Sequence, residues 1–316
     1  MGKKFPTRPA IRKMGTIGCS IVETTPIVWK GELYRFEVIR GNYLTEKTAK
    51  KPSDFPDHPC LRFMHIRTNT PTPFFAENHT FGFPFAEGDT MYVVTCNSTD
   101  WGGNKLDFYR SNDLENWEKY SEIHLLGWRT YNMNIAKMGD TYTLLVEIAA
   151  PVEEAGDFPF TFRFLQSKDM TNWELTPREC VFHKDRYCGS PSIYTLEDDP
   201  YYYVGYLEAY PDYRFANSLA RSKDLINWEY SPINPVLMYN EFEDKQIASP
   251  FLTPEERERI KEAIDTNNSD MELCEYLGRT LIYYSWGDQR GTEFLAEAWY
   301  EGSMKEFLTS FFEVKE

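Results

Sequence analysis

The sequence predicts an all-β fold made of repeated four-stranded units, and two features carry this prediction. A nine-residue pattern, x-Ser-x-Asp-Leu/Met-x-Asn-Trp-Glu, occurs at residues 110–118, 166–174 and 221–229. The copies start 56 and 55 residues apart, and a pattern that returns at nearly constant spacing indicates a structural repeat. Aromatic residues, which favour strands, make up 16% of the chain.

The first unit is expected to follow an irregular leader at residues 1–17. β-Branched and aromatic residues at 18–29 and 33–40 flank a glycine-containing turn, which is the pattern of a hairpin. A third strand is expected at residues 60–68.

Four more hairpins follow the same plan. They are expected at residues 81–95, 132–147, 190–208 and 271–285. Four strands and about 56 residues per unit give five blades, in the manner of repeat folds whose blades are four-stranded sheets. Residues 18–316 are therefore predicted to form a single domain, a five-bladed β-propeller with four-stranded antiparallel blades.

One helix is expected to interrupt the strands near residues 253–265. Thr253 can cap its first turn, Pro254 fits the first helical position, and glutamates follow in the first turn. This helix lies between the fourth and fifth units, so we expect it to be an insertion in the propeller.

The repeated tryptophans are predicted to be structural. They are Trp117, Trp173 and Trp228. Equivalent positions of different blades cannot converge on one active site, so each tryptophan is expected to fill the gap to a neighbouring unit.

Charge and composition exclude several classes of function. The net charge of -15 argues against binding to nucleic acid or to an anionic membrane surface, since both need a basic face. No apolar run approaches the ~20 residues of a membrane helix, and no signal peptide is recognised, so a cytoplasmic location is expected. Motifs for nucleotide, zinc or serine-nucleophile chemistry are absent, so no cofactor is expected to be required. A propeller axis could hold a Ca²⁺ ion, but the sequence assigns it no ligands.

The repeated units resemble the five-bladed β-propeller glycoside hydrolases, among them families 43, 32, 117 and 130. The resemblance covers residues 18–316 and depends on the segments that close the blades, such as residues 222–228. It implies an oligosaccharide substrate and an active site in a central funnel, where carboxylates often hydrolyse a terminal sugar with inversion. Glu23 lies where family 43 has an aspartate in the first blade, whereas the openings of the third and fourth blades, residues 131–134 and 188–191, contain no acid.

Four acids are candidates for the catalytic carboxylates. Glu23 and Asp270 lie at the starts of the inner strands of the first and fifth units, which are neighbours if the ring closes. Glu147 and Glu208 end second strands, and each is a single acid in an apolar strand. A first strand starts at the hairpin edge where the second strand ends, so all four are expected at one rim. Hydrolysis needs an acid for the leaving oxygen and a base or nucleophile on the other face, and these roles stay unassigned among the four.

Other residues are expected at the same rim as substrate-binding groups. Arginines there could hold carboxylates ionised or bind an acidic group, and Trp286 or Trp101 could stack on a sugar ring. The predicted substrate-binding residues are His79, Arg40, Arg67, Arg129, Asn134, Trp286 and Gln289.

The leading hypothesis is an exo-acting, inverting glycoside hydrolase. One alternative is a non-catalytic carbohydrate-binding propeller, because two of the family 43 acids have no counterpart. The other alternative is a phosphate-dependent glycoside phosphorylase, because Arg40, Arg67 and Arg129 could bind phosphate together.

Overall fold

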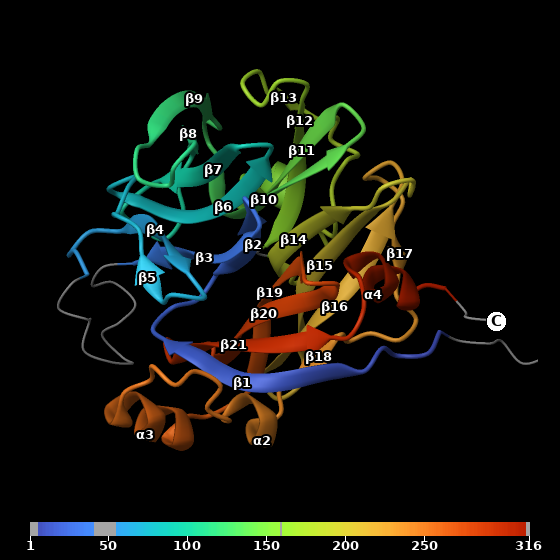
Figure 1. The fold of residues 1–316 in the computed structure, drawn as a ribbon. Coiled ribbons are helices and arrows are strands. Elements are labelled where there is room, and N and C mark those ends of the chain that lie inside the picture. The colour runs from blue at the N-terminus through green and yellow to red at the C-terminus, as the bar shows by residue number, and fades with distance from the viewer. Residues whose placement is uncertain (1–5, 41–54, 159, 314–316) are drawn as a thin grey trace, which may run out of the picture.

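The computed structural model describes residues 6–40, 55–158 and 160–313, so the first five residues of the expected leader lie outside the described part. Three antiparallel four-stranded sheets form the first part of the chain (Figure 1). The first contains β2 (Thr25–Trp29), β3 (Glu32–Ile39), β4 (Cys60–His65) and β5 (Thr70–Pro71). The second contains β6 (His79–Glu87), β7 (Thr90–Asn97), β8 (Lys105–Ser111) and β9 (Glu118–His124). The third contains β10 (Arg129–Met138), β11 (Thr141–Ala150), β12 (Thr161–Ser167) and β13 (Glu174–Leu175).

The remaining strands form one nine-stranded sheet with two antiparallel parts. One part contains β14 (Gly189–Thr195), β15 (Tyr202–Tyr210), β16 (Arg214–Ser222), β17 (Glu229–Tyr230) and β18 (Leu237–Met238). The other contains β19 (Asn267–Tyr276), β20 (Arg279–Gly287), β21 (Glu293–Tyr300) and β1 (Ile11–Cys19). A single parallel pair, Phe215 with Asn267, joins the two parts. Each part therefore repeats the plan of the first three sheets.

The first strands of these units surround a common centre. β2 contacts β6, β6 contacts β10, β10 contacts β14, β14 contacts β19, and β19 contacts β2. These strands lie toward the middle of the molecule in Figure 1, and the later strands of each sheet lie farther out. The ring of contacts is closed, so the predicted arrangement of repeated sheets around an axis is confirmed.

The nine-residue repeat forms a hydrogen-bonded turn after the third strand of a sheet. Ser111 Oγ accepts hydrogen bonds from the backbone N–H groups of Asp113 and Leu114, at 3.2 and 2.9 Å. Asp113 Oδ1 accepts a third bond, from the N–H group of Asn116 at 2.8 Å. The other two copies repeat the aspartate–asparagine contact. Short polar side chains thus satisfy the backbone of the turn, as the sequence predicts.

Each repeated tryptophan stacks on the third strand of the preceding sheet. The ring centroids of Trp117 and Phe63 are 5.7 Å apart, and those of Trp173 and Phe108 are 5.5 Å apart. Trp228 stacks on Phe164 at 6.0 Å. The tryptophans therefore fill the gaps between sheets, and their predicted structural role is confirmed.

The segment 11–17 is not irregular, and this part of the leader prediction is wrong. It belongs to β1, which pairs antiparallel with β21 and supplies the fourth strand of the last sheet. Gly15 has φ 108°, and a Cβ there would lie 2.3 Å from the carbonyl oxygen of Gln246. This strand contains no copy of the repeat, and its partner β21 lies near the other end of the chain. No local pattern in the sequence therefore indicates the pairing.

Four helices are described: α1 (Val152–Ala155), α2 (Glu241–Asp244), α3 (Pro254–Glu262) and α4 (Met304–Ser310). The predicted helix is α3, and its predicted cap is present: Thr253 Oγ1 accepts from the N–H group of Glu256, whose carboxylate accepts from the N–H group of Thr253. Within the described ranges, every helix is too short or too polar to cross a membrane.

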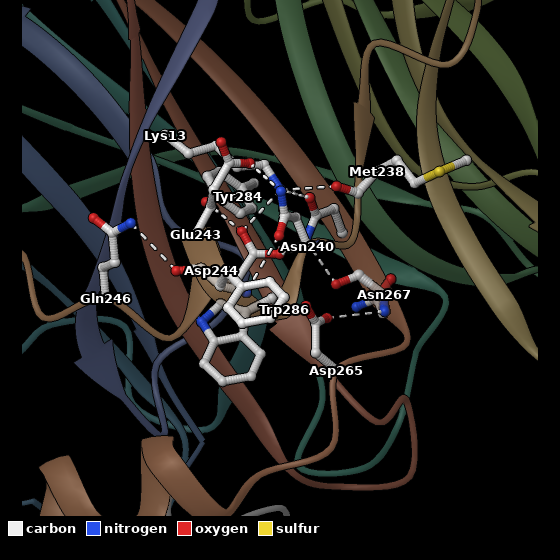
Figure 2. Close-up of polar contacts among 12 residues, drawn as sticks. Lys13, Met238, Asn240, Glu243, Asp244, Gln246, Asp265, Asn267, Tyr284 and Trp286 are labelled. Atoms are coloured by element: carbon white, nitrogen blue, oxygen red, sulfur yellow. Dashed lines mark hydrogen bonds and ion pairs between the residues drawn. The ribbon is translucent and has the colours of Figure 1, made fainter.

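A buried polar cluster holds β1 against α2 and the last sheet (Figure 2). Lys13 Nζ lies 2.8 Å from Asp244 Oδ1 and 2.7 Å from Asn268 Oδ1. Tyr284 donates to Asp244 Oδ1 at 2.8 Å. The side chains of Lys13 and Asp244 are 7% and 0% exposed, so this ion pair is shielded from water.

We expect Lys13→Met to destabilise the protein by ~3–5 kcal/mol, because it leaves the buried charge of Asp244 without its cation. The measurement is the free energy of unfolding from denaturant titration. Lys168→Met is the matched control, since its ion pair with Asp140 is exposed and screened by water, so its loss should change the stability little. Equal stabilities of the two variants would contradict the expected role of Lys13.

Candidate active site

A pocket opens at the end of the ring where the first strands begin. It encloses about 440 Å³ of empty space, part of it open to solvent. Its lining comes from every unit of the fold. The lining residues are Glu23, Arg40, Phe81, Trp101, Tyr131, Asn132, Glu147, Phe160, Tyr187, Ser190, Asp270, Gln289 and Glu293.

The pocket continues inward between the first strands. Met133, Pro191 and Glu272 line this deeper part, and each lies one or two residues further along its strand than a residue of the mouth. The first strands run inward side by side, so this deeper part lies along the axis of the ring.

The backbone at several strand starts is left-handed, which is uncommon for residues other than glycine. Glu23, Phe81, Ser190 and Asp270 have φ values of 54°, 54°, 48° and 50°. The last three lie at β-bulges in the pairing of the first and second strands. Bulges redirect side chains next to active sites, and strained residues cluster there. Here all four residues line the pocket.

Glu23 and Arg40 form an ion pair inside the pocket. The guanidinium of Arg40 also lies 5.8 Å from the ring centroid of Phe81 and 5.4 Å from that of Trp101. Burial raises the pKa of Glu23 to about 7, and the charge of Asp270 adds to this rise, while Arg40 opposes it. Glu23 can therefore exchange a proton near neutral pH.

Glu147 lines the same pocket and is held by N–H groups of two neighbouring strands. Its Oε2 accepts hydrogen bonds from the backbone and side chain of Asn132, at 3.2 and 2.8 Å. Its Oε1 accepts from the N–H group of Ser190 at 3.1 Å. Burial raises the pKa of Glu147 to about 8, and the charge of Glu23 contributes, although these hydrogen bonds act against the rise.

Two more carboxyl groups complete the mouth of the pocket. Asp270 accepts a hydrogen bond from Ser269 Oγ at 3.1 Å. Glu293 is the first residue of β21, and burial raises its pKa to about 7 against the effect of Arg40. The charges of Asp270 and Glu23, which line the same pocket, also raise the pKa of Glu293.

Glu272 lies in the deeper part of the pocket and is 9% exposed. It accepts hydrogen bonds from Asn134 Nδ2 at 3.0 Å and from the hydroxyl of Tyr194 at 3.0 Å. Burial raises the pKa of Glu272 to about 8 in spite of these bonds. Asn134 therefore positions an acid below the mouth and does not itself line the pocket.

One wall of the pocket is aromatic. Trp101 packs edge-on against Phe81 at 5.3 Å, and Tyr131 packs edge-on against Phe160 at 4.9 Å. Phe160 in turn contacts Tyr187 at 5.8 Å. Trp101 is 38% exposed, so part of its indole ring is open at the mouth.

The structure brings together some of the predicted site residues. Glu23, Glu147, Asp270, Arg40 and Gln289 all line the pocket. Trp101, which the sequence analysis also suggested as a sugar platform, lines it too.

The structure places the other predicted residues outside the pocket. Glu208 bonds Arg186 at 3.2 Å and Ser218 at 3.0 Å. The two ring nitrogens of His79 lie 2.8 Å from the carbonyl oxygen of Glu77 and 3.0 Å from Asp107 Oδ2. Both residues therefore have partners elsewhere in the protein.

Three further predicted site residues also lie outside the pocket in the structure. Arg67 is exposed and pairs with Glu32 at 2.8 Å. Arg129 donates to the backbone oxygen of Trp101 at 2.7 Å, so it supports the aromatic wall from outside. Trp286 is 0% exposed and stacks on Phe294 at 4.6 Å, which excludes it as a sugar platform.

Sequence reasoning missed Glu293 and Glu272 as site residues. Glu293 begins a third strand, whereas the predicted catalytic acids all lie at the starts of first strands or the ends of second strands. Glu272 follows Asp270 by two residues, so the alternation of side chains along a strand could have found it. Among the residues that the structure describes, no group of three or more His, Cys, Asp and Glu side chains is arranged to hold a metal ion.

No protein-family model matches this sequence, and no curated protein is significantly similar to it. Solved structures are similar in fold. An α-L-arabinofuranosidase from Podospora anserina, in complex with cellotriose, has a TM-score of 0.61 at 10% identity, covering 94% of this chain and 98% of that chain. The catalytic domain of the Coprinopsis cinerea GH62 α-L-arabinofuranosidase has a TM-score of 0.58 at 11% identity, covering 94% and 98%.

A xylan β-1,4-xylosidase from Bacillus halodurans is also similar, with a TM-score of 0.54 at 13% identity. The similarity covers 93% of this chain and 54% of that chain. These similarities confirm the predicted resemblance in fold: the chain has the β-propeller fold of these glycoside hydrolases.

We expect the buried acids to make the protein less stable as the pH rises. The pKa of Glu272 is raised in the folded state, so its contribution is fully present below about pH 4.5 and is lost as the pH rises through about 8. Glu272→Gln should therefore raise the melting temperature by several degrees near pH 8 and change it little near pH 4.5.

The control for this experiment is Glu258→Gln, which removes one negative charge from the exposed side of α3. Melting temperatures of wild type and both variants are compared across this pH range. A gain that is equal for the two variants would assign the effect to net charge and would contradict a specific role of Glu272.

Proposed function

We propose that this protein is an exo-acting, inverting glycoside hydrolase that cleaves a terminal sugar from an oligosaccharide. The observation that carries this proposal is the convergence of Glu23, Asp270, Glu147 and Glu293 in one pocket beside an aromatic wall. Glycoside hydrolysis needs one carboxyl group to protonate the leaving oxygen and another to activate water or to act as nucleophile. Two of these carboxyl groups have pKa values raised to about 7, which suits proton transfer near neutral pH.

The shape of the pocket supports action on a chain end. Glu272 and Met133 line the deeper part of the pocket, between the first strands. A sugar chain that enters there would bind by its terminal residue. We propose that this ring consists of five blades in a single domain, with one terminal sugar bound between their first strands.

The aromatic wall suits a sugar as ligand. Rings of Trp101, Tyr131 and Phe160 contribute apolar surface to the pocket lining, and aromatic faces pack well against the C–H groups of sugar rings. The carboxylates and Asn132 can accept or donate hydrogen bonds to hydroxyl groups. Recognition would therefore combine apolar contact with polar contacts.

The placement of the arginines favours hydrolysis over phosphorolysis. A phosphorylase needs several basic groups around the phosphate, but Arg67 and Arg129 lie outside the pocket and only Arg40 lines it among the described residues. Arg40 is already paired with Glu23. The carboxyl groups around it would repel phosphate and other anions, including acidic sugars.

We expect Glu23→Gln and Asp270→Asn each to lower kcat by ~100-fold or more, because each removes a carboxyl group at the reacting centre. Activity is measured with a panel of nitrophenyl glycosides and oligosaccharides. The panel includes an α-L-arabinofuranoside and a β-D-xyloside, since solved structures with this fold are an arabinofuranosidase and a xylosidase.

Glu208→Gln is the matched control, because Glu208 ends a second strand as Glu147 does but bonds Arg186 outside the pocket. It should keep wild-type activity. Sugar release that survives in both Glu23→Gln and Asp270→Asn would show that the site is wrong. Saturable binding of a glycan without turnover in wild type would show a binding protein instead.

A further inference from the structure

Glu293 differs from the other acids of the pocket because its carboxyl group has no partner. It accepts no hydrogen bond and forms no ion pair with any residue that the structure describes, although it lines the pocket. Glu23 is paired with Arg40, and both oxygens of Glu147 accept N–H bonds. Asp270 accepts one hydrogen bond, from Ser269 Oγ. Among the described acids at the mouth of the pocket, Glu293 is therefore the one with both carboxyl oxygens available to a ligand.

The backbone around Glu293 is held rigidly. Glu293 pairs with Gly287 at the end of β20, and the next residues, Phe294 and Leu295, are 0% and 1% exposed. Phe294 stacks on Trp286 on one face of β21, and Leu295 packs beside Ile21 on the other. Side chains alternate along a strand, so Glu293 extends the face of Leu295 toward Glu23 and the pocket.

We infer that Glu293 is the proton donor to the leaving group, a further catalytic residue of the proposed glycosidase. This inference rests on the proposed function. A general acid must carry a proton and must be able to direct it at the glycosidic oxygen. A carboxyl group whose oxygens already accept N–H bonds, as in Glu147, cannot turn toward a ligand without breaking those bonds.

The proposed step is a single displacement. Glu293 gives its proton to the glycosidic oxygen while the bond from that oxygen to the anomeric carbon breaks. A water molecule attacks the anomeric carbon from the opposite face, and its proton goes to the carboxylate of Asp270 or Glu23. The products are the free sugar and the shortened alcohol, and proton exchange with water restores both carboxyl groups.

The surroundings of Glu293 favour the protonated form before the step. The charged groups that act on it are Arg40 after β3, Glu23 before β2, Asp270 in β19 and Asp288 after β20. Three of these are acids, and the single cation is paired with Glu23. Repulsion by neighbouring carboxylates therefore keeps a proton in the pocket near neutral pH.

The test is the dependence of rate on the leaving group in Glu293→Gln. Wild type and variant are assayed with phenyl and 2,4-dinitrophenyl glycosides of the sugar that wild type releases. A phenol leaving group needs protonation, whereas dinitrophenolate does not. We expect kcat/KM for the phenyl glycoside to fall by ~100-fold or more and that for the dinitrophenyl glycoside by less than ~10-fold. The alkaline limb of the pH profile should also disappear.

Glu297→Gln is the control, because Glu297 lies on the same strand and face but outside the pocket lining. It should leave both rates unchanged. Glu293→Asp, which keeps an acid one methylene shorter, should retain part of the activity on the phenyl glycoside. Melting temperatures of all variants establish that they are folded.

The outcomes separate this inference from the proposed function. Equal losses on the two glycosides in Glu293→Gln, or no loss on either, would overturn the assignment of the proton donor while the glycosidase remains. A wild-type protein that is inactive on every glycoside would overturn the proposed function and the assignment with it.

Discussion

The packing of each sheet against both of its neighbours is the constraint on which the structure depends. A four-stranded sheet of this size cannot bury its two faces alone, so neighbouring sheets must cover them. The contact between sheets is made by an aromatic pair, in which a tryptophan such as Trp173 stacks on a phenylalanine such as Phe108 of the preceding sheet. Stacked aromatic pairs add ~0.5–1.5 kcal/mol beyond the area that they bury. This contact joins the first four sheets in succession, and contacts of the first strands join the last sheet to both of its neighbours and close the ring.

Closure of the ring explains why the last sheet differs from the repeated units. The last sheet lacks the repeated turn, and β1 from the other end of the chain supplies its fourth strand. Lys13 and Asp244 then secure β1 in the interior, where a mispaired strand would leave a charge unsatisfied. Closure also brings the starts of the first strands around one axis. Residues as distant in sequence as Glu23 and Asp270 can therefore act on one ligand.

Sequence reasoning predicted the scaffold well because its signals are local and repeated. It also identified Glu23 and Asp270, since a strand start can be located by counting from the repeat. It failed for Glu208, although Glu147 and Glu208 occupy similar apolar strands. In the hairpin of β10 and β11, the pair next to the bulge is Met133 with Val146, and Glu147 is the first residue after Val146. In the hairpin of β14 and β15, the corresponding pair is Ser192 with Gly205, and Glu208 is the third residue after Gly205. Hydrophobic patterning specifies the face of a strand, whereas the site depends on register and on bulges, which pairing between strands decides.

The chemistry of the pocket follows from an imbalance of charge that the fold imposes. Among the residues that the structure describes, Glu23, Glu147, Asp270 and Glu293 line the pocket together with one guanidinium, that of Arg40. Burial penalises every ionised form, and one cation cannot compensate four anions, so the pocket retains protons at a pH where exposed glutamates have lost theirs. This costs stability, as do the left-handed residues at the strand starts. Under the proposed function, the same imbalance would favour positive charge as it develops on a sugar ring during bond cleavage, because ionised carboxylates then gain a partner. The scaffold would then stabilise an arrangement that is unfavourable without substrate and becomes favourable as the bond breaks.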